Sequence, residues 1–480
     1  MKRNQATTPL YEKLVDYANK ERVSFHVPGH KNGIVFPEVG RDIFQSILTI
    51  DMTELNGLDD LHAPTGVIKE AEGLAADYFG ADHTFFLVGG STSGNLAMIL
   101  SVCSLGDKMI VQRNSHKSVM NGLELAGAHP VFVAPQFDET VDRYTSPLPE
   151  SIMQAIDCHP DAKGVVLTYP DYFGRTYDIK LIIDYAHDRG IPVLIDEAHG
   201  VHFSLGTPFP PSALDLGADL VVQSAHKMAP SMTMSSYLHI KSAFISRNSV
   251  SHYLQMLQSS SPSYPLMASL DLARSFLTEI GHEEVTEIIT SVNEVRSILS
   301  ESELWDIIPL TSEDDPLKIT LQTKAGLSGY AVGNAFEANH IYPELTTHNQ
   351  VLLIHELSVF QENDQLLNTV KNITEQLKII DNHATIDVSK LFPNVIEELA
   401  MDYIQMQKNE TLRTSLNEAV GAVAADAIIP YPPGVPLILK GERITTAQVT
   451  LLTELIKQGA SIQIDDIDEG IYIYKGEYLL

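Results

Sequence analysis

Short apolar runs alternate with amphipathic stretches of about ten residues or more over the first half of the chain. The apolar runs predict buried strands at 84–88, 108–112, 130–134, 164–169, 192–196 and 218–223. Helical periodicity predicts helices at 8–21, 68–79, 96–103, 116–126, 149–158 and 179–189. This alternation predicts an α/β fold, with a central, mainly parallel sheet covered by helices on both faces.

The pattern changes after Tyr237. A Ser/Pro-rich loop at 258–265 precedes a long helical stretch that runs to about Leu299, and the polar segment TSEDDP at 311–316 marks a boundary. A second polar break lies near Asn382. We therefore expect an N-terminal segment (1–66), a large α/β domain (67–310), a small α+β domain (311–380) and a C-terminal domain (381–480).

A lysine and an aspartate follow two of the predicted buried strands. Lys227 ends the run ADLVVQSAHK, and Asp196 ends the strand of PVLIDEAHG. Open α/β sheets bind their ligands at the carboxyl ends of the strands. Pyridoxal phosphate needs a lysine for its aldehyde and an acid for its pyridine nitrogen, so the two residues together indicate a large domain that binds this cofactor.

The segment GGSTSGN at 89–95 follows a strand and opens a helix, as a phosphate cradle does. Ser91, Thr92 and Ser93 are its candidate donors, and Ser224 and His226 beside Lys227 are within reach of the same phosphate. The segment is a weak signal alone, because small-residue turns between a strand and a helix are common.

The histidines allow several interpretations. His116, just after a strand, either stacks on the cofactor ring or is a capping or core histidine. His26 and His30 have the spacing of helical metal ligands, but the Pro–Gly pair between them opposes a helix. His199 and His202 are too loosely framed for a metal, so we predict no metal site.

The 480 residues have a formal net charge of −30 at pH 7, which disfavours nucleic acid and anionic membranes as partners. The two cysteines, Cys103 and Cys158, argue against a disulfide framework or a cysteine-based zinc site. No signal peptide and no run of membrane-spanning length is found, so we expect a cytoplasmic protein.

At these motifs the sequence resembles the Orn/Lys/Arg decarboxylase family, which consists of pyridoxal-phosphate enzymes of the aspartate-aminotransferase fold (fold type I). It is most similar to the short form of Gram-positive bacteria, known as arginine or lysine decarboxylase. The resemblance covers residues 8–270 and 420–445. It is carried by FHVPGHKNG, LDDLHAPTGVIKEAE, GGSTSGN, QRNSHKS, DAKGVVLTYPDYFG, VLIDEAHG, SAHK, SSSPSYP and YPPGVPLILKGE.

The resemblance implies a role for each candidate residue. Lys227 would hold the cofactor as a Schiff base, Asp196 would pair with the pyridine N–H, His116 would stack on the ring and His199 would lie beside it. The phosphate would be held by Ser91, Thr92, Ser224 and His226. Ser260 would be supplied by the neighbouring subunit, because such enzymes are at least homodimers with the site at the interface.

The chain departs from the family in two respects. Tyr169 and Asp171 stand where relatives commonly have asparagine and threonine, which puts the contacts at the ring edge in doubt. The N-terminal regulatory-type domain of the larger members has no counterpart here, so assemblies that depend on it are not expected.

The implied reaction is decarboxylation of a basic amino acid that feeds polyamine metabolism: arginine to agmatine first, lysine to cadaverine next, ornithine third. His226 and Lys227 are both candidates for the acid that protonates Cα. The distal cation of the substrate would meet Glu442 or an acid near 343–345. Two alternatives are an aminotransferase, for which no arginine clamp is evident, and a non-catalytic protein that binds amino acids or polyamines.

Overall fold

The computed structural model describes residues 3–20, 23–324, 326–377, 388–389, 391–431, 434–464 and 466–475. The chain forms two compact units, and it passes between them more than once. Unit 1 consists of Met1–Val102 and Ile179–Gly281, and unit 2 consists of Cys103–Asp178 and His282–Leu480. The expected break near Asn382 lies outside the described residues.

The strands of unit 1 lie in the order β1-β9-β8-β7. They are β1 (His83–Leu87), β7 (Val193–Asp196), β8 (Leu220–Gln223) and β9 (Ser236–Ile240). β7 and β8 are parallel, as predicted, whereas β9 runs antiparallel to both β8 and β1. Every residue of β7, β8 and β9 is buried, which explains why β7 and β8 read as apolar runs.

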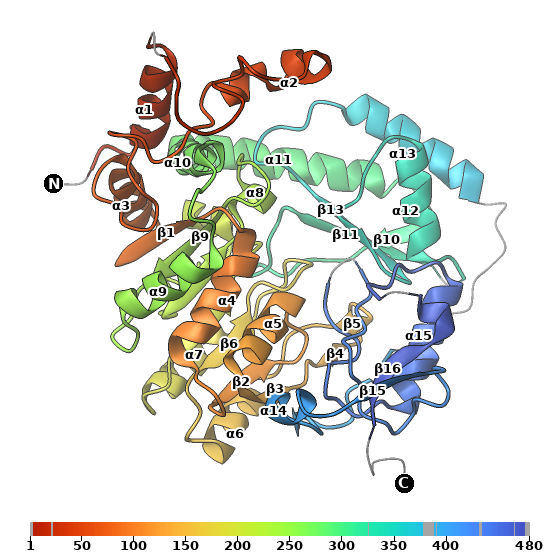
Figure 1. The fold of residues 1–480 in the computed structure, drawn as a ribbon. Coiled ribbons are helices and arrows are strands. Elements are labelled where there is room, and N and C mark those ends of the chain that lie inside the picture. The colour runs from red at the N-terminus through yellow and green to blue at the C-terminus, as the bar shows by residue number, and fades with distance from the viewer. Residues whose placement is uncertain are drawn as a thin grey trace. The chain divides into compact units, whose positions relative to one another are not determined.

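Helix α4 (Gly90–Val102) packs directly on these strands, beside α9 (Arg247–Leu257), as Figure 1 shows. A Cβ atom on Gly94 would lie 2.2 Å from Cγ2 of Val222, so this close contact between helix and sheet requires glycine. The remaining helices of unit 1 near the sheet are α3 (Val67–Phe79), α7 (Ile179–His187), η1 (Val201–Leu205), α8 (Ala225–Met228) and α10 (Tyr264–Glu279).

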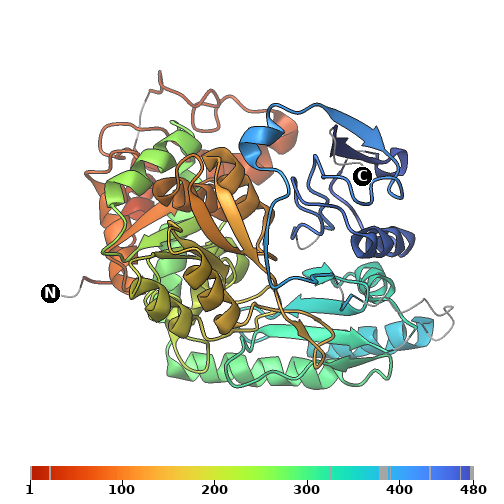
Figure 2. The ribbon, with the colours of Figure 1, turned by 90° about the horizontal axis from the view of Figure 1, so that it is seen from below.

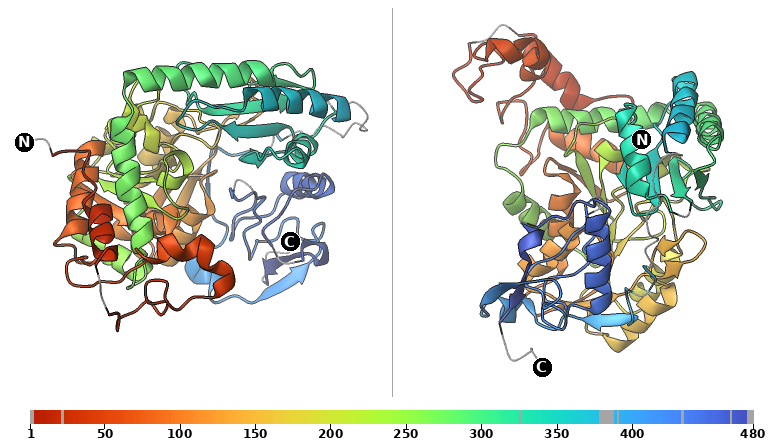
Figure 3. Two further views of the ribbon diagram at one scale, coloured as in Figure 1. Left: turned by 90° about the horizontal axis from the view of Figure 1, so that it is seen from above. Right: turned by 90° about the vertical axis from the view of Figure 1, so that its right-hand side faces the viewer.

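The N-terminal part of unit 1 has one packed helix and one helix that stands apart. α1 (Pro9–Ala18) packs against α3 and α10 through the buried Leu10 and Leu14. α2 (Glu38–Leu48) buries only Leu48, and Figure 3 shows it away from the strands of its unit. The segment 23–44 exposes large apolar side chains: Val23, Phe25, Val27, Ile34, Val35, Val39, Ile43 and Phe44.

The first part of unit 2 has strands in the order β6-β2-β3-β14. These are β2 (Lys108–Gln112), β3 (His129–Val133), β6 (Val165–Thr168) and β14 (Ile396–Glu398). β2 is parallel to β3 and β6, and β14 is antiparallel to β3. Helices α5 (Lys117–Ala126) and α6 (Pro149–Cys158) follow as predicted, and β4 (Phe137–Asp138) pairs with β5 (Arg143–Tyr144).

A small antiparallel sheet in the order β10-β11-β13-β12 forms the next part of unit 2. Its strands are β10 (Trp305–Ile307), β11 (Lys318–Thr323), β12 (Leu345–Thr346) and β13 (Gln350–Ile354). The long helix α11 (His282–Leu299) runs along this sheet and packs against α13 (Asn363–Leu377), as Figures 2 and 3 show. α12 (Gly329–Ala338) also packs on the sheet, which agrees with the predicted α+β character.

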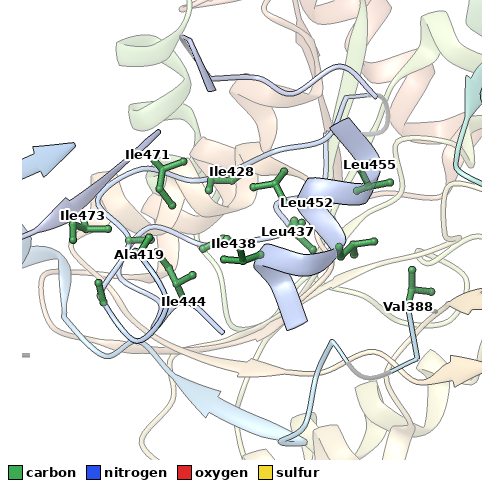
Figure 4. Packing of buried hydrophobic residues seen from close by; sticks show 14 residues of the cluster. Val388, Ala419, Ile428, Leu437, Ile438, Ile444, Leu452, Leu455, Ile471 and Ile473 are labelled. Carbon is green, nitrogen blue, oxygen red and sulfur yellow. The ribbon is translucent and has the colours of Figure 1, made fainter. Parts of the chain in front are cut away.

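The C-terminal part of unit 2 has its own hydrophobic core, drawn in Figure 4. Ile438, Ile444, Leu452, Ile471 and Ile473 pack together there. The elements are α14 (Tyr403–Met406), β15 (Thr411–Thr414), α15 (Thr446–Lys457), η2 (Ile467–Glu469) and β16 (Ile471–Tyr474). α15 begins with a capping box of Thr445 and Gln448, which satisfies free backbone N–H groups at its start.

Three local differences from the predicted elements bear on the site. The helical stretch that ends near Leu299 is two helices, α10 and α11, separated at residues 280–281. The helix after β1 begins inside GGSTSGN, at Gly90, so the hydroxyl residues lie in its first turn. Lys227 lies in the one-turn helix α8 instead of at a strand end. None of the helices in the described residues is long and apolar enough to cross a membrane.

Candidate active site

Lys227 lies just beyond the carboxyl end of β8, in α8. Its backbone N–H donates to the carbonyl of Ser224 at 3.1 Å, which closes the turn between strand and helix. Its Nζ lies 3.1 Å from Nε2 of His199, a residue that is almost fully buried. The amine is therefore held on an imidazole at the carboxyl edge of the unit 1 strands.

Asp196 is the last residue of β7 and is 4% exposed. Asn95 donates from Nδ2 to Oδ2 of Asp196 at 2.8 Å, and the backbone N–H of Ala198 donates to Oδ1 at 3.2 Å. Within the described part of the chain, no lysine, arginine or histidine forms an ion pair with Asp196. A buried carboxylate of this kind suits a cationic N–H of a ligand.

The parallel register places Asp196 and the Lys227 turn at one edge. Asp196 is aligned with Val222 of β8, and two residues later Ser224 begins the turn that leads to Lys227. Because β7 and β8 are neighbouring parallel strands, both functional groups leave the sheet at its carboxyl end. This is the arrangement that the sequence predicts.

A group of hydroxyls meets at the first turn of α4. Ser91 Oγ lies 2.7 Å from Ser224 Oγ and donates to Ser236 Oγ at 3.3 Å. Thr92 is exposed beside them, whereas Ser93 is buried and donates to the carbonyl of Gly90 at 2.9 Å. The structure thus brings Ser91 and Ser224 together at a helix N-terminus and directs the Ser93 hydroxyl to its own helix.

His226 is fixed by Ser235, the residue that precedes β9. Its Nδ1–H donates to the carbonyl of Ser235 at 3.0 Å, and its backbone N–H donates to the same oxygen at 3.3 Å. With Nδ1 engaged as a donor to a carbonyl, Nε2 is the ring nitrogen that is able to accept or carry a second proton. Its side chain is partly exposed.

His116 lies in unit 2, at the start of α5, where it is the N-cap residue. Nδ1 accepts from the backbone N–H of Ser118 at 3.2 Å and lies 2.8 Å from Oγ of Ser118. The structure therefore gives His116 the capping role that the sequence left open. Its stacking on the cofactor ring stays a prediction.

Ser260, assigned by resemblance to the partner's site, is exposed in the loop between α9 and α10. The carbonyl of its neighbour Ser259 accepts from Nε2 of His62 at 2.8 Å, and Tyr264 donates to the carbonyl of Asp59 at 2.6 Å. These two bonds hold the ends of the loop on the preceding segment of unit 1. The exposed position is compatible with a contact to another subunit.

Two residues at the predicted ring edge, Asp171 and Tyr169, have structural partners. Asp171 accepts from Arg143 at 2.6 Å and from the backbone N–H groups of Phe173 and Arg175, so its carboxylate organises its own turn. Tyr169 is buried and meets Tyr177 edge to face.

The carboxylate of Glu442, which was expected to meet the substrate's distal cation, forms an ion pair with Arg113 of the same unit. Its contact with the substrate stays a prediction. Nη2 of Arg113 donates to Oε2 of Glu442 at 2.7 Å, and Gln448 donates to Oε1 at 3.1 Å. Glu344, the acid near 343–345, is exposed.

Two buried residues that sequence reasoning did not assign lie beside Asp196 and help to hold the end of β7 in place. Asn95, the last residue of GGSTSGN, orients Asp196. Glu197 is fully buried and accepts from the backbone N–H of Ala213 at 2.7 Å and from Gln223 at 2.5 Å. Burial raises the pKa of Glu197 to about 8. The position of Asn95 within the motif was the only available signal.

These groups fit pyridoxal phosphate. The buried Asp196 carboxylate matches the pyridine nitrogen, the Lys227 amine matches the aldehyde, and the Ser91 and Ser224 hydroxyls at a helix N-terminus match the phosphate. Each match rests on donor and acceptor chemistry within unit 1.

Comparison with known families gives two matches along the chain. Residues 8–314 match the major domain of Orn/Lys/Arg decarboxylases, and residues 384–460 match their C-terminal domain. The resemblance drawn from the motifs is thereby confirmed.

Similar proteins support the same family, and a solved structure supports the predicted fold. The chain is 45% identical to the uncharacterized protein YaaO of Bacillus subtilis (strain 168), over 95% of this chain and 96% of the relative. It is 37% identical to an arginine decarboxylase of the same organism, over 96% of both chains. A constitutive lysine decarboxylase structure from Escherichia coli superposes with a TM-score of 0.80 at 21% identity, over 98% of this chain and 82% of that one. This likeness confirms the predicted fold.

Proposed function

Because the chain belongs to the Orn/Lys/Arg decarboxylase family and is a pyridoxal-phosphate-dependent amino acid decarboxylase, we propose that it converts arginine to agmatine. The observation that carries the proposal is that the Lys227 amine, beside His199, and the buried Asp196 carboxylate, held by Asn95, follow neighbouring parallel strands at the same edge. An aminotransferase or a protein that only binds its ligand has no comparable support.

Bound pyridoxal phosphate supplies an aldehyde for the substrate amine and a ring that accepts the electron pair left when CO2 departs. Asp196, held by the Asn95 amide, would keep a proton on the pyridine nitrogen. Ser91 and Ser224 would bind the phosphate, with the first turn of α4 adding N–H groups. His116 would stack on the ring and exclude water there.

The proton that replaces CO2 on Cα comes from Nζ of Lys227 or Nε2 of His226. Lys227 has the buried His199 ring 3.1 Å away, which accepts or returns a proton as the amine changes state. The Nδ1 atom of His226 is hydrogen-bonded to the Ser235 carbonyl, so Nε2 is the ring nitrogen that would donate the proton. The two donors are separable by experiment, since only Lys227 also binds the cofactor covalently.

Arginine is preferred to lysine because relatives named arginine decarboxylase, including proteins of Bacillus subtilis and Bacillus anthracis, are 37% and 35% identical over almost the whole chain. The Pseudomonas aeruginosa relative named lysine decarboxylase is 25% identical. We further propose that agmatine enters polyamine synthesis. A cytoplasmic location is consistent with two free cysteines, Cys103 and Cys158.

We also propose that the protein is at least a homodimer with its site at the subunit interface. The eight exposed apolar side chains of segment 23–44 support this, because a soluble monomer rarely shows so many large apolar groups on one short segment. A second copy of the chain is the partner that the family fold implies. Ser260 would reach the site of that copy.

The deciding experiment is CO2 release by the protein loaded with pyridoxal phosphate and offered arginine, lysine and ornithine separately. We expect the highest kcat/KM with arginine and stoichiometric agmatine. A higher value with lysine would replace arginine as the substrate and leave the reaction class intact. Cofactor-bound protein that releases CO2 from none of the three would contradict the proposed function.

A further inference from the structure

The loop 434–442, which begins with Gly434 and ends with Glu442, packs against the turn that carries His116. The backbone N–H of Lys117 donates to the carbonyl of Gly434 at 3.0 Å. A Cβ atom placed on Gly434 would lie only 3.1 Å from both Cδ2 and Nε2 of His116, and φ of Gly434 is +87°. The backbone of Gly434 therefore borders one edge of the imidazole, where any larger residue would disturb the ring.

The opposite edge of the same ring is fixed by α5. Nδ1 of His116 accepts from the backbone N–H of Ser118, so Nδ1 carries no proton in the neutral ring and Nε2 does. The Nε2 edge is the one that Gly434 borders. His116 is thus held from two sides, by the start of α5 and by the loop 434–442.

Arg113, three residues before His116, fastens the loop. Its side chain is almost fully buried, and its guanidinium donates to the carbonyls of Pro436 at 2.9 Å and Leu437 at 3.1 Å. Its backbone N–H donates to the carbonyl of Val133 at 2.9 Å, which ties the residue to β3. The planar fork of arginine joins two consecutive carbonyls of the loop to the sheet.

Glu442 holds the other end of the loop 434–442 in place. Its carboxylate accepts from Arg113 at 2.7 Å and from the backbone N–H of Leu439 at 2.7 Å. Gln448, which caps α15, donates to the other carboxylate oxygen at 3.1 Å. The arginine and the glutamate therefore compensate each other's charge while binding the loop at three backbone positions.

We propose that Arg113 and Glu442 are positioning residues that act through the loop 434–442 to hold His116 against the cofactor. The proposal rests on the proposed function in one respect, the stacking of His116 on pyridoxal phosphate. It gives the YPPGVPLILKGE motif a task in cofactor binding, through Gly434 and the carbonyls of Pro436 and Leu437, and assigns Glu442 to this task instead of to substrate recognition.

The test measures the dissociation constant for pyridoxal phosphate by absorbance, without substrate. Arg113→Met is expected to weaken binding roughly tenfold to hundredfold, since displacement of a positioned group by about 1 Å has effects of that size. Gly434→Ala should act in the same direction without removing a charge. Arg296→Met is the matched control, because Arg296 is also an arginine of unit 2 that donates to two carbonyls, those of Pro316 and Lys318. It should change the constant less than twofold, roughly.

A double-mutant cycle separates positioning from general stability. In a His116→Ala background, Arg113→Met should weaken cofactor binding no further, because the residue through which it acts is gone. Arg113→Lys should restore part of the affinity. Equal losses in both backgrounds, or unchanged affinity in both Arg113→Met and Gly434→Ala, would overturn the proposal. Because no substrate is present, failure to decarboxylate arginine would leave this result interpretable.

Discussion

The side-chain amide of Asn95 donates a hydrogen bond to the carboxylate of Asp196 at 2.8 Å, across 101 residues of sequence. Asn95 is 1% exposed and Asp196 4%, so the bond is made away from water. An N–H donor stabilises the ionised form of a buried carboxyl, which is the form that pairs with a protonated pyridine. Asn95 is therefore placed to orient the Asp196 carboxylate.

Replacement of Asn95 by leucine, which is similar in size, should lower kcat by about tenfold to hundredfold, because a hydrogen bond to a charged group is worth about 1.5–3 kcal/mol. The measurement is CO2 release at saturating arginine and cofactor. Ser101→Ala is the control, since it removes a hydrogen bond at the other end of α4, to the carbonyl of Met98. Wild-type kcat in Asn95→Leu would show that Asp196 needs no such support.

Lys227→Ala should abolish decarboxylation together with the absorbance of the lysine-bound cofactor, because the amine that would hold the aldehyde is removed. Lys241→Ala is the matched control, as Lys241 also lies in unit 1 and donates to the carbonyl of Leu214 at 3.3 Å. It should keep both signals. Appreciable turnover by Lys227→Ala would remove Lys227 from the mechanism.

Asp196→Ala should keep part of the cofactor and lose most of the activity, by a factor of about a hundred or more, since an ion pair to the pyridine nitrogen is lost from a buried site. Cofactor content and kcat, measured on the same sample, separate the two effects. A near wild-type kcat would mean that the pyridine proton is held by another group.

The buried strands could be predicted because burial on both faces leaves an apolar run, as in β7 and β8. β9 could not be predicted, since it is equally buried but carries His239. That residue bonds to Gln223 at 3.0 Å and to Thr84 at 2.8 Å, so its polarity is satisfied by partners far away in sequence. A pattern of hydrophobic positions along the chain does not show which buried polar side chains hydrogen-bond to one another.

Prediction of the candidate site from the sequence has the same limit, because contacts between distant residues are not visible in it. Lys227 and Asp196 could be placed because each follows an apolar strand of a parallel pair. The ion pair of Glu442 could not be predicted, because its charge is visible in the sequence whereas its partner Arg113 lies 329 residues earlier. Which carboxylates are already neutralised by a partner is decided by tertiary structure alone.

The stability of the protein should fall as the pH rises through the range set by Glu72. Burial raises the pKa of Glu72 from 4.5 to about 8, against the opposing effects of the Phe86 N–H and the Arg247 charge. The folded state then retains a proton that the unfolded state has lost, so its stability is full below about pH 4.5 and declines until about pH 8. The loss is at most about 1.4 kcal/mol per pH unit.

Glu72→Gln removes this titration and keeps an acceptor for the Phe86 N–H, which donates to Glu72 at 3.1 Å. The stability of the variant relative to wild type should therefore rise between about pH 5 and about pH 8, measured by denaturant unfolding. Glu70→Gln, at an exposed position of the same helix, should show no such trend. A stability difference that is independent of pH would contradict the proposed titration.

Self-association should depend on the apolar segment 23–44. Phe25, Val39 and Ile43 are 94%, 96% and 83% exposed, so their replacement by serine removes no packing from the described core. Burial of one such side chain contributes about 1.5–3 kcal/mol, and in a symmetric dimer each residue counts twice. The triple variant should thus weaken the dimer by roughly a thousandfold or more, as measured by sedimentation velocity over a series of concentrations.

A triple serine variant at Leu181, Phe244 and Met256 is the control, because these exposed apolar residues of unit 1 lie outside the segment. It should dimerise like wild type. If the site is shared between subunits, the segment variant should also lose activity on dilution, and activity should return at high protein concentration as dimers re-form. A wild-type protein that is monomeric and fully active at every concentration would rule out both the dimer and the shared site.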